Sequence, residues 1–153
     1  MAYEVLYYNC AHMDALDENR LLQIATIEAS SFRSVWSENM LRETAGQTYN
    51  HLWMAMDGKA VCGYLFASII GDETELLRIA VAQKNRRRGC ARQLMEEYLA
   101  FVQGMCERAF LEVRQHNLPA QKLYEAHGYA SIAVRKDYYS QPVESAIIYE
   151  KKF

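Results

Sequence analysis

The chain has 153 residues, of which 51% are hydrophobic and 24% are charged. This composition is typical of a folded domain and excludes a disordered chain, and the length suits a single core, so we expect residues 1–153 to form one domain. The formal net charge of −2 argues against a protein that grips nucleic acid over a wide surface.

The cysteines give no sign of a disulfide framework or a metal centre. Cys10, Cys62, Cys90 and Cys106 show no CxxC spacing, and only Cys10 and His12 form a close pair. We therefore expect no metal site. No signal peptide and no long uncharged apolar run is visible, so we expect reduced thiols, a cytoplasmic location and no membrane partner. The oligomeric state is left open.

Two helices are predicted in the first third of the chain. Asp17 can cap a helix over residues 18–30, and Ser37 can cap a second helix. Trp36 and Leu41 stand at the positions of a hydrophobic staple around that second cap. A staple role for Trp36 is at least as well supported by the residues alone as a role in a binding site.

Short β-branched and aromatic runs predict a sheet. The predicted strands cover residues 5–8, 51–56, 61–70, 74–81, 109–114, 129–134 and 146–150. Asp57-Gly58 is a strong hairpin signal and Gly71-Asp72 is a further turn, so the second to fourth strands form an antiparallel meander. The fifth is expected to lie parallel to the fourth after a helical crossover. The fold class is therefore α+β in three layers (α/β/α), with a mixed, mostly antiparallel sheet of about six or seven strands and about four helices.

The centre of the chain reads as a strand, a basic glycine turn and a helix. Residues 76–81 form an apolar run broken only by Arg78, as expected for a well-buried strand. Three arginines and Gly89 follow. Apolar residues then recur along one helical face, at Ala91, Leu94, Met95, Tyr98, Leu99 and Val102.

The start of that helix has no capping side chain. The first N–H groups of any helix lack internal partners, and a Ser, Thr, Asp or Asn usually caps them. No such residue occurs from Arg86 to Ala91. Open amides, the positive end of the helix dipole and three arginines together indicate an anion site. From the residues alone, a solvated basic run is the simpler alternative.

A second group of chemical side chains follows the fifth strand. Alternation places Glu112 on one face of that strand together with Phe110 and Arg114. Asn117 suits the N-cap of the next helix, and Tyr124 lies two turns further along the same helix face. The side chains of Glu112 and Tyr124 can therefore point into the same cleft. The alternatives are an ion pair with Arg114 or another neighbour for Glu112, and core packing with a bonded hydroxyl for Tyr124.

The turn resembles a known signature. Arg86-x-x-Gly89-x-Ala91, between a strand and a helix, resembles the (Arg/Gln)-x-x-Gly-x-(Gly/Ala) signature of the GCN5-related N-acetyltransferases, the GNAT family. In that family the amides of this turn hold the pyrophosphate of acetyl-coenzyme A, and the preceding strand pairs with the pantetheine arm. Gln83 and Asn85 depart from the family, which often has Pro and an aromatic residue there.

The C-terminal half resembles the RimI-type ribosomal-protein alanine N-acetyltransferases within that family. The matching segments are 111–114, Asn117, 123–125, 128–129, 135–139 and 144–148. Ser145 stands where an Asp is usual. Residues 32–41 resemble the Trp-Ser segment that helps to form the acceptor side in these enzymes.

The resemblance implies a role for each matching residue. Glu112 would be the general base and Tyr124 the general acid. The acetyl-CoA contacts it implies are Ile79, Ala80, Val81, Arg86, Arg87, Arg88, Gly89, Cys90, Ala91, Arg92 and Asn117. Trp36, Tyr138 and Tyr139 would contact the acceptor. Direct attack of the amine on the thioester is expected, with backbone N–H groups near Ala80 and Val81 holding the oxyanion.

The acceptor implied by the resemblance is the N-terminal α-amine of a protein, in particular a ribosomal protein. Three alternatives remain open. The acceptor could be a lysine side chain or a small amine, Cys90 could carry the acyl group as a nucleophile, or the chain could be a non-enzymatic RNA- or ribosome-binding module. The acidic balance and the lack of interleaved aromatic residues disfavour direct nucleic-acid binding.

Overall fold

The computed structural model describes residues 3–12 and 16–153, and these residues form seven strands, four α-helices and a short 3-10 helix. The strands are β1 (Glu4–Asn9), β2 (Asn50–Asp57), β3 (Ala60–Ile70), β4 (Glu73–Val81), β5 (Arg108–Arg114), β6 (Ala130–Tyr139) and β7 (Glu144–Lys152). The helices are α1 (Glu18–Ser31), α2 (Glu38–Gly46), η2 (Gln83–Asn85), α3 (Cys90–Val102) and α4 (Leu118–Ala126). Every predicted element is present. The largest difference in bounds is at β6, which continues to Tyr139 instead of ending near Val134.

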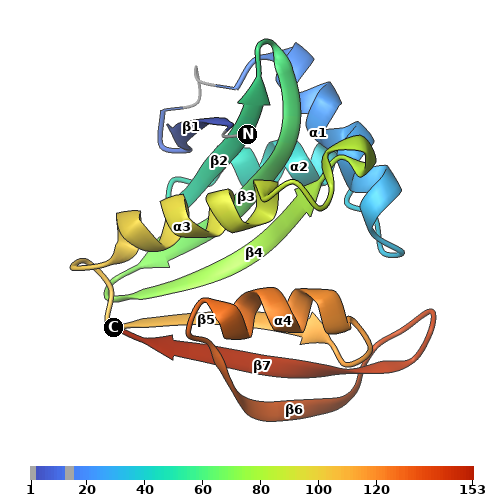
Figure 1. Cartoon of the computed structure of the whole chain (residues 1–153), viewed down its shortest axis with the longest axis vertical. Helices are drawn as coiled ribbons and strands as arrows, with labels where there is room; N and C mark the ends of the chain where they lie inside the picture. The colour runs from blue at the N-terminus through green and yellow to red at the C-terminus, as the bar shows by residue number, and fades with distance from the viewer. Residues whose placement is uncertain (1–2, 13–15) are drawn as a thin grey trace.

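The strands form one sheet in the order β1-β2-β3-β4-β5-β7-β6. Only β4 and β5 are parallel, and the other neighbours are antiparallel. Helices α1 and α2 lie on one face and α3 and α4 on the other, which gives three layers (Figure 1). This arrangement confirms the predicted fold class, including the meander β2-β3-β4.

Side-chain caps begin three of the four α-helices. Asp17 accepts a hydrogen bond from the amide of Arg20 at 2.8 Å, and Ser37 accepts one from Met40 at 3.2 Å. Asn117 caps α4 by accepting from Ala120 at 3.3 Å. All three caps were predicted. Helix α3 differs, because its N-cap is a glycine with no side-chain hydrogen bond.

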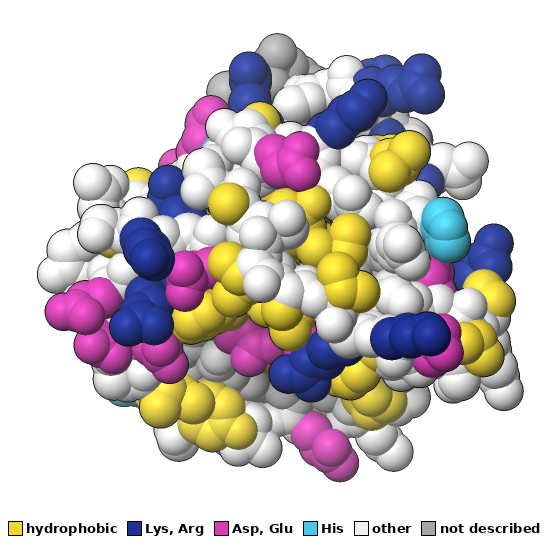
Figure 2. Space-filling model, turned by 90° about the horizontal axis from the view of Figure 1, so that it is seen from below, with side chains coloured by type: hydrophobic (Ala, Val, Ile, Leu, Met, Phe, Trp, Pro, Cys, Tyr) yellow, Lys and Arg dark blue, Asp and Glu magenta, His cyan; other side chains and the backbone are white. Residues whose placement is uncertain are grey.

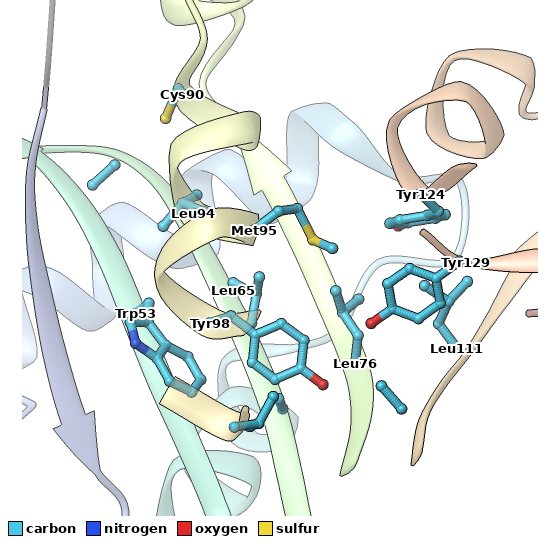
Figure 3. Packing of buried hydrophobic residues seen from close by; sticks show 14 of the residues in the cluster. Trp53, Leu65, Leu76, Cys90, Leu94, Met95, Tyr98, Leu111, Tyr124 and Tyr129 are labelled. Atoms are coloured by element: carbon cyan, nitrogen blue, oxygen red, sulfur yellow. The ribbon is translucent and has the colours of Figure 1, made fainter. Parts of the chain in front are cut away.

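Helix α3 packs its predicted apolar face on the sheet. Leu94, Met95 and Tyr98 are fully buried there. Figure 3 shows Leu76 of β4 between the rings of Tyr98 and Tyr129, so this core continues from α3 to the C-terminal part of the sheet. A second core on the opposite face lies beneath α1 and α2. The two cores fix α3 and β4 relative to each other, which positions the turn between them.

Strands β4 and β5 separate soon after they pair. Their parallel register covers only Glu73 with Arg108, Thr74 with Ala109 and Glu75 with Phe110. Beyond these pairs the two strands diverge (Figure 1). A register shift between β3 and β4 at Phe66/Ala67 accompanies the separation. The split places the second half of β4 beside an opening.

The expectation that residues 76–81 form a well-buried strand is wrong for most of the run. Leu76 and Ala80 are buried, but Leu77, Arg78, Ile79 and Val81 are only half-buried. The reason is the split, because β5 does not cover the free edge of β4 there. The partial exposure of these four residues is therefore caused by the opening beside β4.

Strand β6 is the free edge at the C-terminal end of the sheet. Its large apolar side chains Ile132 and Val134 are exposed. Seen from below, the molecule shows hydrophobic side chains gathered in the middle of this face, with charged side chains around them (Figure 2).

Candidate active site

Three adjoining cavities form a groove from the β4–β5 split to the start of α3. The first lies in the split and is lined by Phe32, Arg33, Ser34, Leu76, Leu77, Arg78, Ile79, Glu112, Val113, Arg114, Asn117, Tyr124 and Tyr139. The second shares Phe32, Ile79, Asn117 and Tyr124 with it. The third, at the α3 turn, shares Val81, Arg86 and Ala91 with the second. Shared walls make these cavities one continuous groove.

The turn end of the groove is built from backbone. Arg87 and Gly89 both have positive φ angles, of 63° and 80°, which turns successive peptide groups towards one side. Within the described residues, no hydrogen bond uses the amides of residues 87–92. The predicted set of open amides at a helix N-terminus is therefore present.

Arg86 holds this turn in place. Its Nε donates to the carbonyl of Val81 at 3.2 Å, and its Nη2 donates to the hydroxyl of Ser31 at 3.2 Å. The guanidinium thus ties the turn to β4 and to the end of α1, while it also lines the groove. Arg87 and Arg92 line the cavity at the turn. Arg88 is exposed and lies outside the walls of the groove.

The free edge of β4 offers peptide groups to the groove. The amide of Ala82 donates to Cys62 of β3 at 2.8 Å. Because alternate residues of a strand point their N–H groups to opposite sides, Ala80 also faces β3, whereas Ile79 and Val81 face the split. The amide of Ala80 therefore cannot serve as an oxyanion donor, and those of Ile79 and Val81 are the ones available.

Glu112 extends from β5 into the first cavity. Its side chain is 25% exposed, and Arg135 Nη2 lies 3.6 Å from its Oε1. Its ion-pair partner is therefore Arg135 and not Arg114, which pairs with Glu144 instead. Glu75 is also close: burial raises the pKa of Glu75, the charge of Glu112 raises it further, and Arg135 lowers it. Glu112 is thus a carboxylate in the cavity wall, and Arg135 forms a long ion pair with it.

Tyr124 reaches the same cavity from α4. The residue is buried, and it lines both the first and the second cavity. Among the described residues its hydroxyl has no hydrogen-bond partner. Burial, with a smaller effect of Tyr139, raises the pKa of Tyr124 above its ordinary value. The hydroxyl therefore stays protonated at neutral and moderately alkaline pH, as a proton donor must.

The other predicted site residues divide into two groups. Asn117 lines the cavities together with Tyr124, and Tyr139 lines the first cavity. Trp36 instead lines a further cavity beside α2, which adjoins the first cavity at Leu77. Tyr138 is half-exposed, with the guanidinium of Arg135 5.3 Å from its ring centre. Trp36 and Tyr138 therefore lie beside the groove and do not form its walls.

Cys90 is poorly suited to carry an acyl group. It is buried, and a Cβ added to Gly63 of β3 would lie 2.9 Å from its sulfur, so the thiol packs against the strand. Burial, with a smaller effect of Cys62, raises the pKa of the Cys90 thiol to about 12. Because the thiolate is the nucleophile, this environment disfavours the predicted alternative of a covalent cysteine route.

The sequence did not point to a network behind the cavity that joins Glu28, Tyr64 and Arg78. Glu28 is completely buried, and Arg78 donates to its two oxygens at 3.0 and 2.7 Å. Tyr64 donates a further bond at 2.5 Å. A signal was available, because Glu28 falls on the apolar face of α1 and Arg78 interrupts an apolar strand.

Among the described residues, no group of three or more His, Cys, Asp or Glu side chains could hold a metal ion. No helix within the described ranges combines the length and the apolar character needed to cross a membrane.

The groove fits an extended ligand with an anionic end. Open amides stand at one end, free peptide groups of β4 line the middle, and Glu112 and Tyr124 lie at the other end. This set of donors suits a coenzyme A thioester. Comparison with known proteins places the chain in a class: the model of the acetyltransferase (GNAT) family matches residues 21–129, and the chain belongs to that family. It is accordingly an acyltransferase.

Its relatives include two enzymes that are named for the acetylation of a ribosomal protein. The chain is 31% identical over 127 residues to the [ribosomal protein bS18]-alanine N-acetyltransferase of Haemophilus ducreyi, covering 82% of this chain and 85% of that protein. It is also 31% identical over 125 residues to the enzyme of the same name from Salmonella typhimurium, covering 80% and 84%.

Solved structures share the fold. The ribosomal-protein-S18-alanine N-acetyltransferase of Escherichia coli superposes with a TM-score of 0.84 at 24% identity, over 97% of this chain and 94% of that one. The Arabidopsis thaliana protein NAA60, in complex with acetyl-CoA, superposes with a TM-score of 0.82 at 16% identity, over 98% and 99%.

Proposed function

We propose that the chain transfers an acetyl group from acetyl-CoA to the N-terminal α-amine of a ribosomal protein. The observation that carries the proposal is one groove that runs from an uncapped helix start to a cavity with Glu112 and Tyr124. The names of the relatives from H. ducreyi and S. typhimurium support a ribosomal protein as the acceptor. Such an acceptor places the reaction in the cytoplasm, where ribosomes are made.

The turn would bind the diphosphate of the co-substrate. The amides of residues 87–92 have no partner within ranges 3–12 and 16–153, and Arg87 and Arg92 add positive charge beside them. The N–H and carbonyl of Ile79 and the N–H of Val81 would pair with an extended arm, as one strand pairs with another, while the carbonyl of Val81 accepts from Arg86. Asn117, from the other side of the groove, would face the same arm. The acyl end would then reach the split between β4 and β5.

The chemistry in the split needs one base and one acid. Acetyl-CoA supplies an activated thioester carbonyl. An α-ammonium has a pKa of about 7.7–8.0 against about 10.4 for lysine, so a carboxylate can remove its proton near neutral pH. Glu112 would accept that proton, directly or through a water, and the free amine would attack the carbonyl carbon.

The steps after the attack involve groups of β4 and α4. A peptide N–H of Ile79 or Val81 would stabilise the negative carbonyl oxygen, an effect of about 3–4 kcal/mol per donor in acyl-transfer enzymes. The carbon–nitrogen bond forms and the carbon–sulfur bond breaks. Tyr124 would give its proton to the leaving sulfur, because burial keeps that hydroxyl protonated. The nitrogen is positively charged after the attack, and its second proton would return to Tyr124, directly or through a water, while Glu112 releases the first proton to solvent.

The test uses purified protein, acetyl-CoA and matched acceptors. One peptide carries the N-terminal sequence of a bacterial ribosomal protein S18, a second has the same sequence with a blocked α-amine and an internal lysine, and spermidine is the third acceptor. We expect mass spectrometry to find the acetyl group on the free α-amine of the first peptide. Equal or faster transfer to the lysine or to spermidine would overturn the proposed acceptor and leave the acetyltransferase class in place.

A further inference from the structure

The segment that joins α1 to α2 lies over the opening between β4 and β5. We call residues 32–36 the acceptor strap. Phe32, Arg33 and Ser34 of this strap line the first cavity. Ser34 is held from both sides of the split, because Arg78 of β4 donates to its carbonyl at 2.5 Å and Arg114 of β5 donates to its hydroxyl at 3.3 Å. One residue thus bridges the two strands that separate at the site.

Arg78 is fixed from behind by a buried carboxylate. Glu28 is completely buried and receives four hydrogen bonds, two from Arg78 and one each from Tyr64 and the amide of Trp36. A buried carboxylate with all its donors in place is rigid, because losing any donor leaves a charge without compensation. The Arg78 side chain, 16% exposed, therefore has one strongly preferred position.

Arg78 also stacks against the two aromatic residues of the strap. Its guanidinium carbon lies 3.8 Å from the ring centre of Phe32 and 4.6 Å from that of Trp36. The planar guanidinium can stack on rings and donate hydrogen bonds along its edge at the same time. Arg78 thus contacts the strap at Phe32, at Ser34 and at Trp36.

Arg114, on β5, is anchored in a similar way, but its carboxylate partner Glu144 is less deeply buried than Glu28, with 8% of its side chain exposed against 0%. Arg114 pairs with Glu144 at 3.3 Å, and its guanidinium carbon lies 4.2 Å from the ring centre of Tyr139. Its bond to Ser34 is a single one to the hydroxyl. The strap therefore depends mainly on Arg78, with Arg114 as a weaker second contact.

We infer that Arg78, locked by Glu28, is a positioning residue that holds the acceptor strap closed over the split and so sets the affinity for the amine acceptor. The inference rests on the proposed function for the identity of the acceptor. Arg78 lines the cavity in the split, where only the acyl end of the co-substrate would lie, whereas the amides that would anchor its diphosphate are at the other end of the groove. Losing Arg78 should therefore weaken acceptor binding far more than acetyl-CoA binding.

The experiment compares Arg78→Met and Arg78→Lys with Arg42→Met as the matched control. Arg42 forms an exposed ion pair with Glu18, remote from the groove, so its loss removes an arginine without touching the strap. We expect Arg78→Met to raise the KM for the peptide acceptor about tenfold or more, and the KM for acetyl-CoA less than about threefold. Arg78→Lys should fall between, because a lysine keeps the charge but cannot bind both oxygens of Glu28 and Ser34 together.

A second measurement covers the case in which Arg78→Met folds poorly. The amide of Trp36 is bonded to Glu28 at 2.9 Å, so hydrogen exchange of residues 32–37 reports directly on the strap. In the folded Arg78→Lys variant we expect faster exchange in this segment and unchanged exchange in α3. The double variant Glu28→Gln with Arg78→Met removes the buried charge and should fold, yet it should keep the raised acceptor KM.

The outcomes separate the inference from the proposed function. If the wild-type protein acetylates a different amine, the same pair of KM values is measured with that amine, and only the acceptor assignment fails. If both KM values move together in the Arg78 variants, or if the acceptor KM matches that of Arg42→Met, the positioning role is refuted. Unchanged exchange of residues 32–37 in Arg78→Lys would refute it as well.

Discussion

The two ends of the groove are built from different parts of the chain. At the α3 end, the groups that would face a ligand are peptide amides, with the charged side chains of Arg87 and Arg92 beside them, while Arg86 holds the loop. At the β4–β5 split, the chemistry lies in side chains, with Glu112 from a strand and Tyr124 from a helix. A site built from backbone groups loses its function when the local conformation changes. A site built from side chains loses its function when one functional group is removed. The two ends should therefore respond to different kinds of substitution.

The largest effect should come from removing the carboxylate. We expect Glu112→Gln to lower kcat about 10²- to 10⁴-fold, because a general base contributes on this scale, and to leave the affinity for acetyl-CoA unchanged. Steady-state kinetics and a calorimetric titration measure the two quantities. Glu97→Gln, at an exposed position of α3, is the matched control. A kcat within about twofold of wild type would remove Glu112 from the mechanism.

Ligand binding at the turn should be sensitive to changes in the backbone conformation. Gly89 and Gly58 both have positive φ angles, of 80° and 58°. Alanine at either position should therefore cost about 1–3 kcal/mol of folding free energy through strain. Only Gly89→Ala should also weaken acetyl-CoA binding, by about tenfold or more, because it distorts the amides that face the ligand. Thermal unfolding and titration of both variants separate strain from binding. Equal affinities in the two variants would argue against a backbone site.

A smaller effect is expected for the proton donor. Tyr124→Phe should lower kcat about tenfold or more, since it removes general-acid help but leaves the thioester reactive. Burial raises the pKa of Tyr124, so its proton is retained as the pH passes the ordinary tyrosine value. The wild-type rate should therefore show no alkaline loss below about pH 10 from this group. An alkaline limb near pH 8 that disappears in Tyr124→Phe would contradict the raised pKa.

Charge at the turn should matter less than its shape. Arg87→Glu should weaken acetyl-CoA binding several-fold, about 1 kcal/mol, because an exposed charge acts through screened interactions. The difference from wild type should shrink when salt is raised. Arg108→Glu, exposed at the start of β5, serves as the control for net charge. The same loss in Arg108→Glu would mean that overall charge, and not the turn, is responsible.

The smallest effect is expected at Cys90. Its thiol pKa is raised to about 12, so almost no thiolate exists at neutral pH. Cys90→Ala should keep kcat within about twofold and lose about 1 kcal/mol of stability through the lost packing. Intact-mass spectrometry should find no acetyl group on the wild-type protein in the absence of acceptor. An acyl-enzyme that disappears in Cys90→Ala would support a covalent route.

Much of the fold could be predicted because its signals are local. The caps at Asp17, Ser37 and Asn117 and the uncapped start of α3 each depend on a few neighbouring residues, and the structure contains all of them. The continuous groove could not be derived from such signals. It depends on how far β4 and β5 stay paired, and that is decided by a register shift against β3 and by the packing of both cores.

The site was predicted less completely for the same reason. Glu28 contacts Arg78 and Tyr64 across 50 and 36 positions of the chain, and no pattern within one element reveals such a network. Trp36, Tyr138 and Arg88 were predicted from motif positions, but their side chains lie outside the groove walls. Motif positions lie around the candidate groove, whereas the direction of each side chain depends on tertiary packing.

An NMR titration that monitors the backbone amide signals tests the binding role of the turn most directly. Acetyl-CoA and acetyl-pantetheine, which lacks the diphosphate, would be added separately to isotope-labelled protein. We predict that acetyl-CoA shifts the amide signals of residues 87–92 strongly, whereas acetyl-pantetheine leaves them in place and shifts Ile79 and Val81. Amides of residues 87–92 that stay unmoved at saturating acetyl-CoA, or that move equally with both compounds, would contradict diphosphate binding at the start of α3.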